Sequence, residues 1–401
     1  MRIVSILLLA VVLNGSCQEI KTGVVESKGQ GDKNLTDSDK TKHPQIDLKL
    51  ISKNACGLTD FVFSRNNKTI GIGLGGEIGF AKGNAIPSGN NKPTETPFPT
   101  RKTPSPVCYS EDFGKSWQGE NGLDFENLGS PQGITEINGK IFITGSRSPV
   151  WLNSENGWRG IYNPKNSKYS FENIEFAHNN ENIGFVVSLS FSDTEHGSRI
   201  FKTQDGGKSW VKVYENIISG WPSDLLVVDK ETAMVAMNDE YILRTEDGGN
   251  TWKPQELENT GRMIKEDDWI DLNDNGASDL TITSRGIVWV VGQKGSLYYS
   301  DDKGKTWKRP DKMPGSIGQQ ELHSIAFSPS GKGVAVGQNG YIIISEDEGK
   351  TWHEISQNVL KNNISESEVT KNLDKLTKVK FNDENAIVLG LQGIYELSFT
   401  R

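Results

Sequence analysis

One eight-residue pattern recurs five times along the chain, and it limits the fold more than any other feature. The copies are SEDFGKSW from Ser110, TQDGGKSW from Thr203, TEDGGNTW from Thr245, SDDKGKTW from Ser300 and SEDEGKTW from Ser345. Every copy has an aspartate at its third position, a glycine two residues later and a tryptophan at its end. A reaction centre does not need five copies of one acid, so the repetition indicates a structural role.

The spacing of the copies indicates a repeat fold. Successive aspartates are 93, 42, 55 and 45 residues apart, so the first gap is about twice the others. A degenerate copy fills that gap, because NSENGW, from Asn153, places Asn156 where the aspartate would be. A period of roughly 45 residues is typical of propellers, whose repeating unit is a blade of four strands.

The runs between the copies read as short antiparallel strands. In the unit before Ser345, LHSIAFSPSG, KGVAVGQNG and YIIISEDEGKTW are rich in Val and Ile and are separated by glycine turns. The last unit, LTKVKFNDENAIVLGLQGIYELSF, has three strands and no copy of the pattern. QIDLKLIS, residues 45–52, can supply its fourth strand. We therefore predict an all-β, seven-bladed β-propeller closed by an N-terminal strand, in preference to a six-bladed ring.

The repeated pattern has a physical basis as a turn. Its carboxylate can accept hydrogen bonds from backbone N–H groups further along, its glycine can take a positive φ, and its tryptophan can pack between blades. The pattern resembles the Asp-box of the BNR-repeat propellers, and that resemblance implies a turn between the third and fourth strands, away from the functional face. The residues assigned to this structural role are Asp112, Asp205, Asp247, Asp302, Asp347, Trp117, Trp210, Trp252, Trp307 and Trp352.

The N-terminus has the features of an export signal. One arginine precedes an apolar run from Ile3 to Leu13 that is too short to span a bilayer. Small residues before Cys17 resemble a bacterial lipoprotein box, although Asn14 stands where leucine is usual. We expect residues 1–17 to form the signal, with lipidation of Cys17 in the cell envelope, and simple secretion is the alternative.

Two further segments follow from composition. Residues 18–45 are polar and poor in large apolar groups, which favours a flexible tether before a propeller at residues 46–401. Two cysteines remain beside Cys17, and in an exported protein Cys56 and Cys108 can form a disulfide or stay as buried thiols. The net charge of −8 argues against a nucleic-acid partner.

Binding is expected on the face opposite the repeated turns, where three long connections gather. These are Gly75–Pro106, Ser190–Arg199 and Glu258–Ser278, and long loops on a rigid scaffold commonly carry binding residues. Four arginines fall on this face and could hold an anionic ligand: Arg101, Arg147, Arg199 and Arg262.

The third connection also contains DLNDNGASD, from Asp271. Oxygen side chains at alternating positions beside a glycine suit calcium, and the segment looks like the calcium loops of FG-GAP and integrin-type propellers. The ligands would be Asp271, Asn273, Asn275 and Asp279. A plain Asn-Gly turn is the alternative, and calcium is the one cofactor that the sequence suggests.

The runs VVGQKGSLYYSDDKGKTW and AVGQNGYIIISEDEGKTW resemble the photosystem II assembly and stability factors. The resemblance implies an exported, non-enzymatic propeller, monomeric in our expectation, that binds a protein or glycan partner and acts in the assembly of an envelope complex. The alternative is a sialidase-like glycoside hydrolase. That activity requires an arginine cluster and a tyrosine nucleophile, and the Arg-Ile-Pro signature of sialidases is absent from the first unit.

Overall fold

A computed structural model describes residues 45–53, 57–64, 69–73, 107–119, 130–146, 150–154, 157–162, 169–178, 180–192, 195–216, 221–237, 241–257, 276–355, 375–391 and 393–400. The chain divides into two compact units, and every described residue belongs to the unit formed by residues 44–76 and 102–401. The other unit, residues 1–43 and 77–101, lies outside the described ranges.

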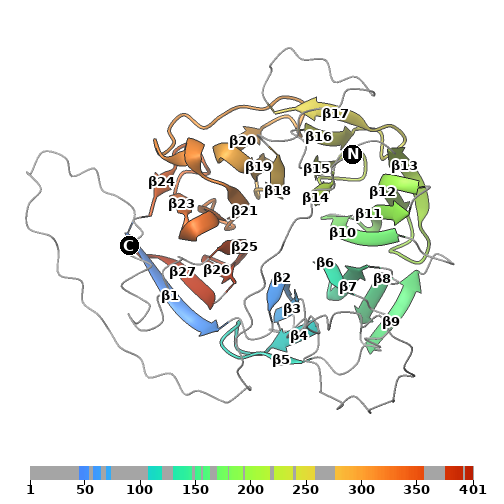
Figure 1. Ribbon diagram of the computed structural model, residues 1–401, viewed down its shortest axis with the longest axis horizontal. Coiled ribbons are helices and arrows are strands. Elements are labelled where there is room, and N and C mark those ends of the chain that lie inside the picture. Colours follow the sequence, from blue (N-terminus) through green and yellow to red (C-terminus); the bar gives the residue numbers. More distant parts are fainter. Residues whose placement is uncertain are drawn as a thin grey trace, which may run out of the picture. The chain divides into compact units, whose positions relative to one another are not determined.

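Seven antiparallel sheets form the described unit and are arranged as the blades of a β-propeller (Figure 1). Blades 1 to 3 consist of β2 (Leu58–Phe63), β3 (Thr69–Gly73), β4 (Val107–Ser110) and β5 (Gln118–Gly119); β6 (Pro131–Ile137), β7 (Lys140–Gly145), β8 (Val150–Ser154) and β9 (Gly157–Tyr162); and β10 (Tyr169–Ala177), β11 (Asn180–Ser192), β12 (Glu195–Thr203) and β13 (Val211–Asn216). The prediction of an all-β propeller with seven blades is confirmed.

Blades 4 to 6 consist of β14 (Pro222–Val227), β15 (Ala233–Met237), β16 (Tyr241–Thr245) and β17 (Lys253–Glu256); β18 (Ala277–Ile282), β19 (Val288–Gly292) and β20 (Leu297–Ser300); and β21 (Leu322–Phe327), β22 (Gly333–Gly337), β23 (Ile342–Ser345) and β24 (His353–Glu354). The outer strand of blade 5 is reduced to a single bridge between Tyr299 and Lys308. Three short 3-10 turns lie in this half of the ring: η1 (Gln293–Gly295), η2 (Ile317–Gln319) and η3 (Gln338–Gly340).

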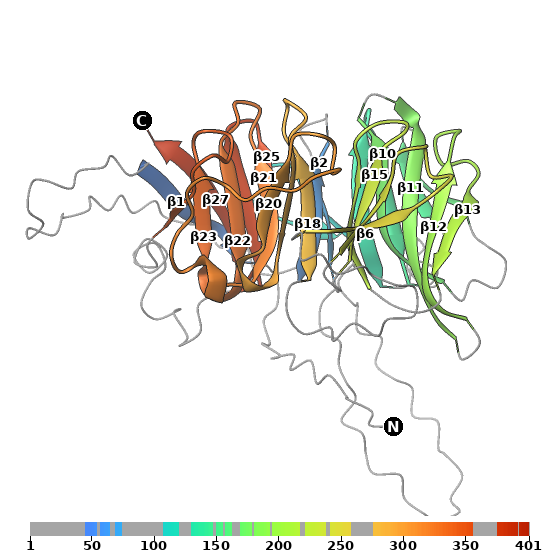
Figure 2. The same cartoon turned by 90° about the horizontal axis from the view of Figure 1, so that it is seen from above.

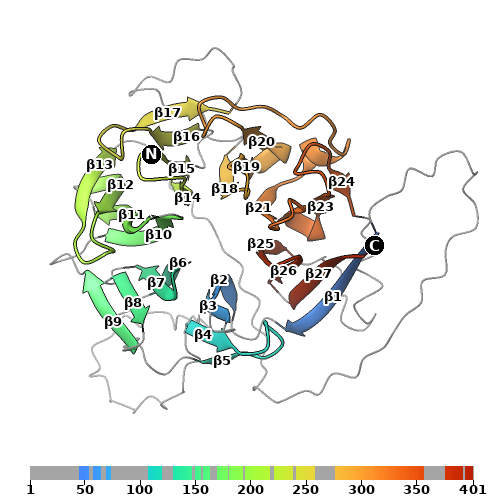
Figure 3. The same cartoon turned by 180° about the vertical axis from the view of Figure 1, so that it is seen from behind.

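Blade 7 is assembled from both ends of the described chain. Its strands are β25 (Leu376–Asn382), β26 (Asn385–Gly390), β27 (Gly393–Thr400) and, as the outer strand, β1 (Gln45–Lys53). β1 pairs antiparallel with β27 so that Leu48 lies opposite Leu397, and the view from behind shows the two strands side by side (Figure 3). Closure of the ring by an N-terminal strand, as the sequence predicts, is confirmed.

The hydrophobic core lies between neighbouring blades rather than at the middle of the ring. One cluster joins Leu226 and Met234 of blade 4 to Val288 and Val290 of blade 5, and equivalent clusters recur around the ring. The strands of each blade run alongside one another through the thickness of the ring (Figure 2). No helix in the described ranges is long and apolar enough to cross a membrane.

Candidate functional site

The five Asp-box turns each connect a third strand to the outer strand of their blade or, in blade 5, to its bridge. In the copy at residues 245–252, the carboxylate of Asp247 accepts hydrogen bonds from the backbone N–H of Thr251 at 2.9 Å and from its hydroxyl at 2.6 Å. A third bond comes from the Thr245 hydroxyl at 2.9 Å. The Thr251 bonds, with those from the rest of the turn, lower the pKa of Asp247 to about 2. Asp112, Asp205, Asp302 and Asp347 accept the same set of bonds in their own turns.

The tryptophan of a box packs against the preceding blade. Trp252 of blade 4 meets Phe185 of blade 3 with ring centroids 5.6 Å apart, and Trp352 of blade 6 meets Trp289 of blade 5 at 5.7 Å. Trp210 is likewise buried, whereas Trp117 and Trp307 are partly buried. The boxes thus join the blades at one face of the ring, which we call the box face.

Of the four arginines that the sequence nominates for binding, only Arg199 is described. It lies on β12 with a side chain 1% exposed, and its Nε donates to Glu215 Oε1 at 2.7 Å. Its guanidinium also lies over the ring of Tyr169, 5.0 Å from the centroid. These contacts hold Arg199 inside blade 3. Arg101, Arg147 and Arg262 lie outside the described residues.

Only some of the nominated calcium ligands and cysteines lie in the described ranges. Asp271, Asn273 and Asn275 lie outside the described ranges, as do Cys17 and Cys56, while Cys108 is buried on β4. Calcium binding, lipidation and the disulfide therefore stay predictions. Within the described residues, no group of three or more His, Cys, Asp or Glu side chains is placed to hold a metal ion.

A ring of mostly polar residues lies on the seven inner strands, and of these the sequence reasoning had singled out Asp279 alone, as a calcium ligand. In every blade, the register of the first strand shifts near the beginning of the strand. One residue of each blade lies within this shift or directly after it, and these seven residues occupy equivalent positions. We call these residues the inner ring: Asp60, Gly133, Asn173, Asp224, Asp279, Ser324 and Lys378. An irregularity of this kind leaves backbone groups without ladder partners and redirects the neighbouring side chain.

The inner ring satisfies backbone groups across blade boundaries. Asp224 accepts a hydrogen bond from the N–H of Leu280 at 2.8 Å, and Asp279 accepts one from Ile325 at 2.8 Å. The Ser324 hydroxyl accepts one from Val379 at 3.1 Å. Each of these three side chains thus accepts a hydrogen bond from the next blade, and the donor is the residue directly after that blade's own inner-ring residue. Gly133 has no side chain because a Cβ there would lie 2.4 Å from the backbone oxygen of Glu172.

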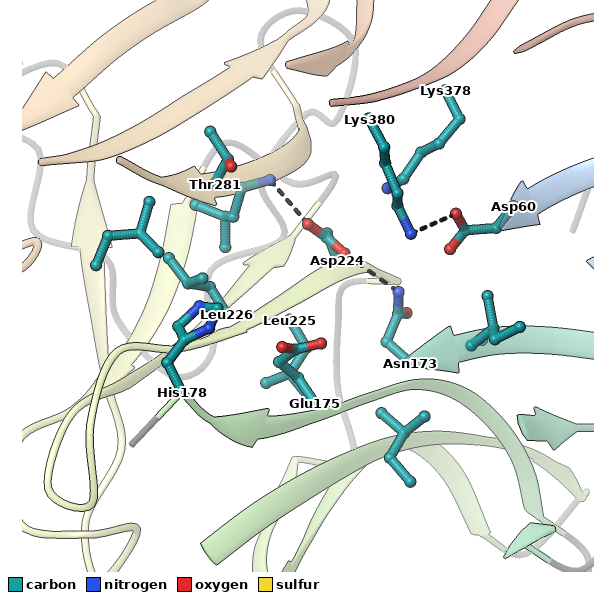
Figure 4. Close-up of a pocket in the computed structure, with 15 residues that line it drawn as sticks. Asp60, Asn173, Glu175, His178, Asp224, Leu225, Leu226, Thr281, Lys378 and Lys380 are labelled. Atoms are coloured by element: carbon teal, nitrogen blue, oxygen red, sulfur yellow. Dashed lines mark hydrogen bonds and ion pairs between the residues drawn. The ribbon is translucent and has the colours of Figure 1, made fainter. Parts of the chain in front are cut away.

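A cavity of about 190 Å³ lies among the inner strands of six blades (Figure 4). Two ion pairs occupy the side nearest blades 7 and 1: Lys378 Nζ lies 2.7 Å from Asp279 Oδ1, and Lys380 Nζ lies 2.8 Å from Asp60 Oδ1. Burial alone would lower the pKa of Lys378, but the carboxylates of Asp279, Asp224 and Asp60 outweigh it and raise that pKa well above its ordinary value.

Two further carboxyl groups face the cavity, those of Glu175 and Asp224, and burial perturbs both. Burial raises the pKa of Glu175 to about 7, against the opposing effects of a hydrogen bond from Thr135 and the charge of Lys380. Burial also raises the pKa of Asp224, although the charge of Lys378 favours the carboxylate. Carboxylates with raised pKa values in a cavity are a recognised mark of a functional site.

A second hollow, a surface groove of about 490 Å³, lies between blades 5 and 6 on the face opposite the boxes. It is lined by Gln293, Lys294, Gly318, Gln319, Gln320, Glu321 and Gln338. Its floor is held by backbone hydrogen bonds, from Gly295 to Gln320 at 2.6 Å and from Gln338 to Glu321 at 3.0 Å. None of the four glutamine side chains makes a hydrogen bond to another described residue.

Comparison with known proteins connects this part of the ring to one family. Residues 264–343 match the family model described as photosynthesis system II assembly factor YCF48. The photosystem II assembly lipoprotein Ycf48 of Synechococcus sp. (strain CC9902) is 24% identical over 153 residues, covering 36% of this chain and 40% of that protein. The resemblance to the photosystem II assembly factors is confirmed.

The curated relatives match only in part. The Ycf48 of Trichormus variabilis is 24% identical over 140 residues, covering 27% of this chain and 41% of that protein. The chain thus spans about two fifths of the length of the curated relatives it matches.

Solved structures share the fold over most of the chain. The structure of YCF48 bound to D1 peptide has a TM-score of 0.58 and 14% identity, covering 90% of this chain and 96% of that one. A virginiamycin B lyase from Staphylococcus aureus has a TM-score of 0.57 and 12% identity, covering 89% of this chain and 100% of that one. Because a binding protein and an enzyme are alike to the same degree, these likenesses show the fold alone.

Proposed function

We propose that this protein is an exported, non-enzymatic scaffold that binds an extended segment of a partner protein in the groove between blades 5 and 6. The observation that carries the proposal is the set of glutamine side chains in that groove, none of which is satisfied within the described residues. An amide side chain both donates and accepts hydrogen bonds, so it can pair with the main chain of an extended peptide.

The comparisons support a protein partner. The groove falls within the segment that matches the assembly-factor model, and the structure of a relative is described as bound to D1 peptide. Lys294 and Glu321 at the groove add one charge of each sign, which would favour a segment with complementary charges. We propose assembly of an envelope complex as the setting, with a protein rather than a glycan as the ligand.

The export signal and Cys17 complete the proposal. Relatives of this chain are named lipoproteins, which supports lipidation of Cys17 and attachment to a membrane surface. A single acyl group gives weak attachment, whereas the several acyl chains of a lipoprotein would hold the propeller at the membrane. Replacement of Cys17 by serine should then release the protein from membranes into the soluble fraction.

Site-specific photo-crosslinking in cells tests the proposed groove. A photoreactive residue placed at Gln319, on the groove, should join the protein to one contiguous segment of a partner polypeptide, identified by mass spectrometry. The same residue at Lys305, which is exposed on the box face, is the matched control and should give no such product. Crosslinks confined to Lys305, or joined to a glycan, would contradict the proposal.

An assay for hydrolysis of fluorogenic sialosides and neutral glycosides tests the glycosidase alternative on the same purified protein. Turnover that disappears on changing Arg101, Arg147 or Arg262 to alanine would favour that alternative over the scaffold.

A further inference from the structure

The charges in the central cavity are not balanced pair by pair. Lys378 and Lys380 lie within 2.8 Å of Asp279 and Asp60, so each lysine already has a carboxylate partner. Glu175 and Asp224 have no lysine, arginine or histidine within ion-pair distance among the described residues. Buried carboxylates are normally paired with a cation, so the half of the cavity near blades 3 and 4 has room for a positive charge.

The two oxygens of the Glu175 carboxylate differ in their hydrogen bonding. Its Oε2 accepts a hydrogen bond of 2.9 Å from the Thr135 hydroxyl, and its Oε1 has no partner among the described residues. The residue keeps accessible surface because it faces the cavity, while the surrounding protein is close enough to disfavour its charge. The close-up shows the carboxyl groups of Glu175 and Asp224 turned toward the same space, with His178 beside them (Figure 4).

Asp224 is fixed in place by the fold. Its Oδ2 is held by the backbone N–H of Leu280 at 2.8 Å, and its Oδ1 receives a long hydrogen bond of 3.4 Å from Asn173. The carboxyl group also lies against that of Asp279, within the field of Lys378. A stronger donor at Oδ1 would therefore gain a site that is already oriented. Positioning of this kind reduces the entropy that a ligand must lose on binding.

The walls of this half of the cavity suit an alkyl chain. Leu226 and Ile282 line it beside the two carboxylates, and methylene groups of a ligand could pack against them. His178 follows the last residue of β10 and is exposed to solvent while lining the same cavity, so solvent reaches the cavity at that end. A metal ion fits less well, because no described group of three metal-ligating side chains is present.

We propose that the central cavity binds an alkylammonium or alkylguanidinium group, with Glu175 and Asp224 as its counter-ions and Leu226 and Ile282 against its chain. The group could be carried by a small free amine or by a lysine or arginine side chain of a partner. The proposal is independent of the groove between blades 5 and 6, which shares no lining residue with the cavity.

Calorimetric titration of the full-length protein tests the proposal. The probes are 1,4-diaminobutane and butylguanidine, with the neutral 1,4-butanediol as a matched control. Both cations should bind and the diol should not. Equal heats for the amine and the diol, or no binding of either cation, would overturn the proposal.

Two isosteric variants locate the binding. Glu175→Gln keeps an acceptor for Thr135, and Asp224→Asn keeps an acceptor for Leu280, so each change removes charge and little else. Each should weaken binding of 1,4-diaminobutane at least tenfold, whereas Glu231→Gln, on the exposed β14–β15 turn, should leave it unchanged. Undiminished binding by Glu175→Gln would overturn the assignment even if Asp224→Asn failed to fold.

A second arm identifies the source of the cation. Short capped peptides containing one lysine or one arginine are titrated alongside the free amines. Binding of the peptides assigns the site to a partner side chain, and binding of the free amines alone assigns it to a small molecule; either result supports the cation site.

Discussion

Asp279 of blade 5 and Ile325 of blade 6 are joined by a hydrogen bond of 2.8 Å between the carboxylate of the first and the backbone N–H of the second. The same carboxylate accepts a bond from Ser324 and faces Lys378 of blade 7. The side chain therefore links its own blade to the next two, and its partners Ser324 and Lys378 also belong to the inner ring. The sequence had nominated Asp279 as a calcium ligand, but here a lysine ammonium lies 2.7 Å from its Oδ1.

Replacement of Asp279 by alanine should destabilise the propeller. The change leaves the Lys378 ammonium buried without its nearest carboxylate and leaves the N–H of Ile325 without its acceptor. We therefore expect the free energy of unfolding to fall by about 3–5 kcal/mol. Urea denaturation followed by tryptophan fluorescence measures this. Asp301→Ala, which removes an exposed pair with Lys308, is the control and should cost under about 1 kcal/mol. Equal losses for the two variants would contradict a special role for the inner ring.

Two glycines with nearly the same positive φ separate the effect of packing from that of backbone strain. Gly349, in a box, has φ +86° and a Cβ there would lie 2.1 Å from the Trp289 ring; Gly286 has φ +82° and open space around it. Gly286→Ala should cost about 1–2 kcal/mol from the left-handed backbone alone. Gly349→Ala should cost a further 1–3 kcal/mol or so from overpacking. Thermal unfolding of both variants tests this, and equal midpoints would show that the box glycine is needed only for its φ.

Closure of the ring should depend on the apolar face of β1. Leu48 is 1% exposed and packs in the cluster shared by blades 6 and 7, whereas its neighbour Lys49 is exposed. Leu48→Ala should lower the free energy of unfolding by about 2–5 kcal/mol because it leaves a cavity. Lys49→Ala on the same strand should change it little. Limited proteolysis should also cut Leu48→Ala sooner, and resistance equal to that of Lys49→Ala would argue that β1 is dispensable.

Glu175 should make stability depend on pH. Its pKa is about 7 in the folded chain, because burial disfavours the carboxylate, against an ordinary value of 4.5. The folded state thus keeps a proton that the unfolded state loses between these values, so the free energy of unfolding falls as pH rises through this window. The charges of Lys380 and Lys378 reduce the rise in pKa and that of Asp60 adds to it.

The test compares wild type with Glu175→Gln in denaturant titrations at pH 4.5 and pH 8. Relative to the variant, wild type should lose up to about 3 kcal/mol over that interval, from 1.36 kcal/mol per pKa unit. Parallel profiles would show that the folded and unfolded states ionise this carboxyl group alike.

The sequence predicts the architecture well because the box is a local motif. All the partners of Asp247 lie within residues 245–251, so one short window contains the whole arrangement. Ring closure was also predictable, for another reason: the last unit lacked an outer strand, and residues 45–52 were a strand-like segment outside any unit.

The cavity escaped sequence reasoning because its residues are dispersed. Asp224 and Lys378, which line it, and Asp279, which pairs with Lys378, come from three blades. In each strand the signal is one charged residue near the start of the strand, as in PSDLLV, ASDLTI and LTKVKF. Aligning the units on their first strands and asking which of them carry a charge at the third residue would have found them. The ion pairs themselves depend on the register irregularities, which no single unit reveals.

The pairing of β1 with β27 also sets an order of events during synthesis. β1 is synthesised before every other strand of the propeller and β27 after them, so the seventh sheet cannot be complete until the ribosome has passed residue 400. Until then the nascent chain carries unpaired strand edges, which attract chaperones and other strands.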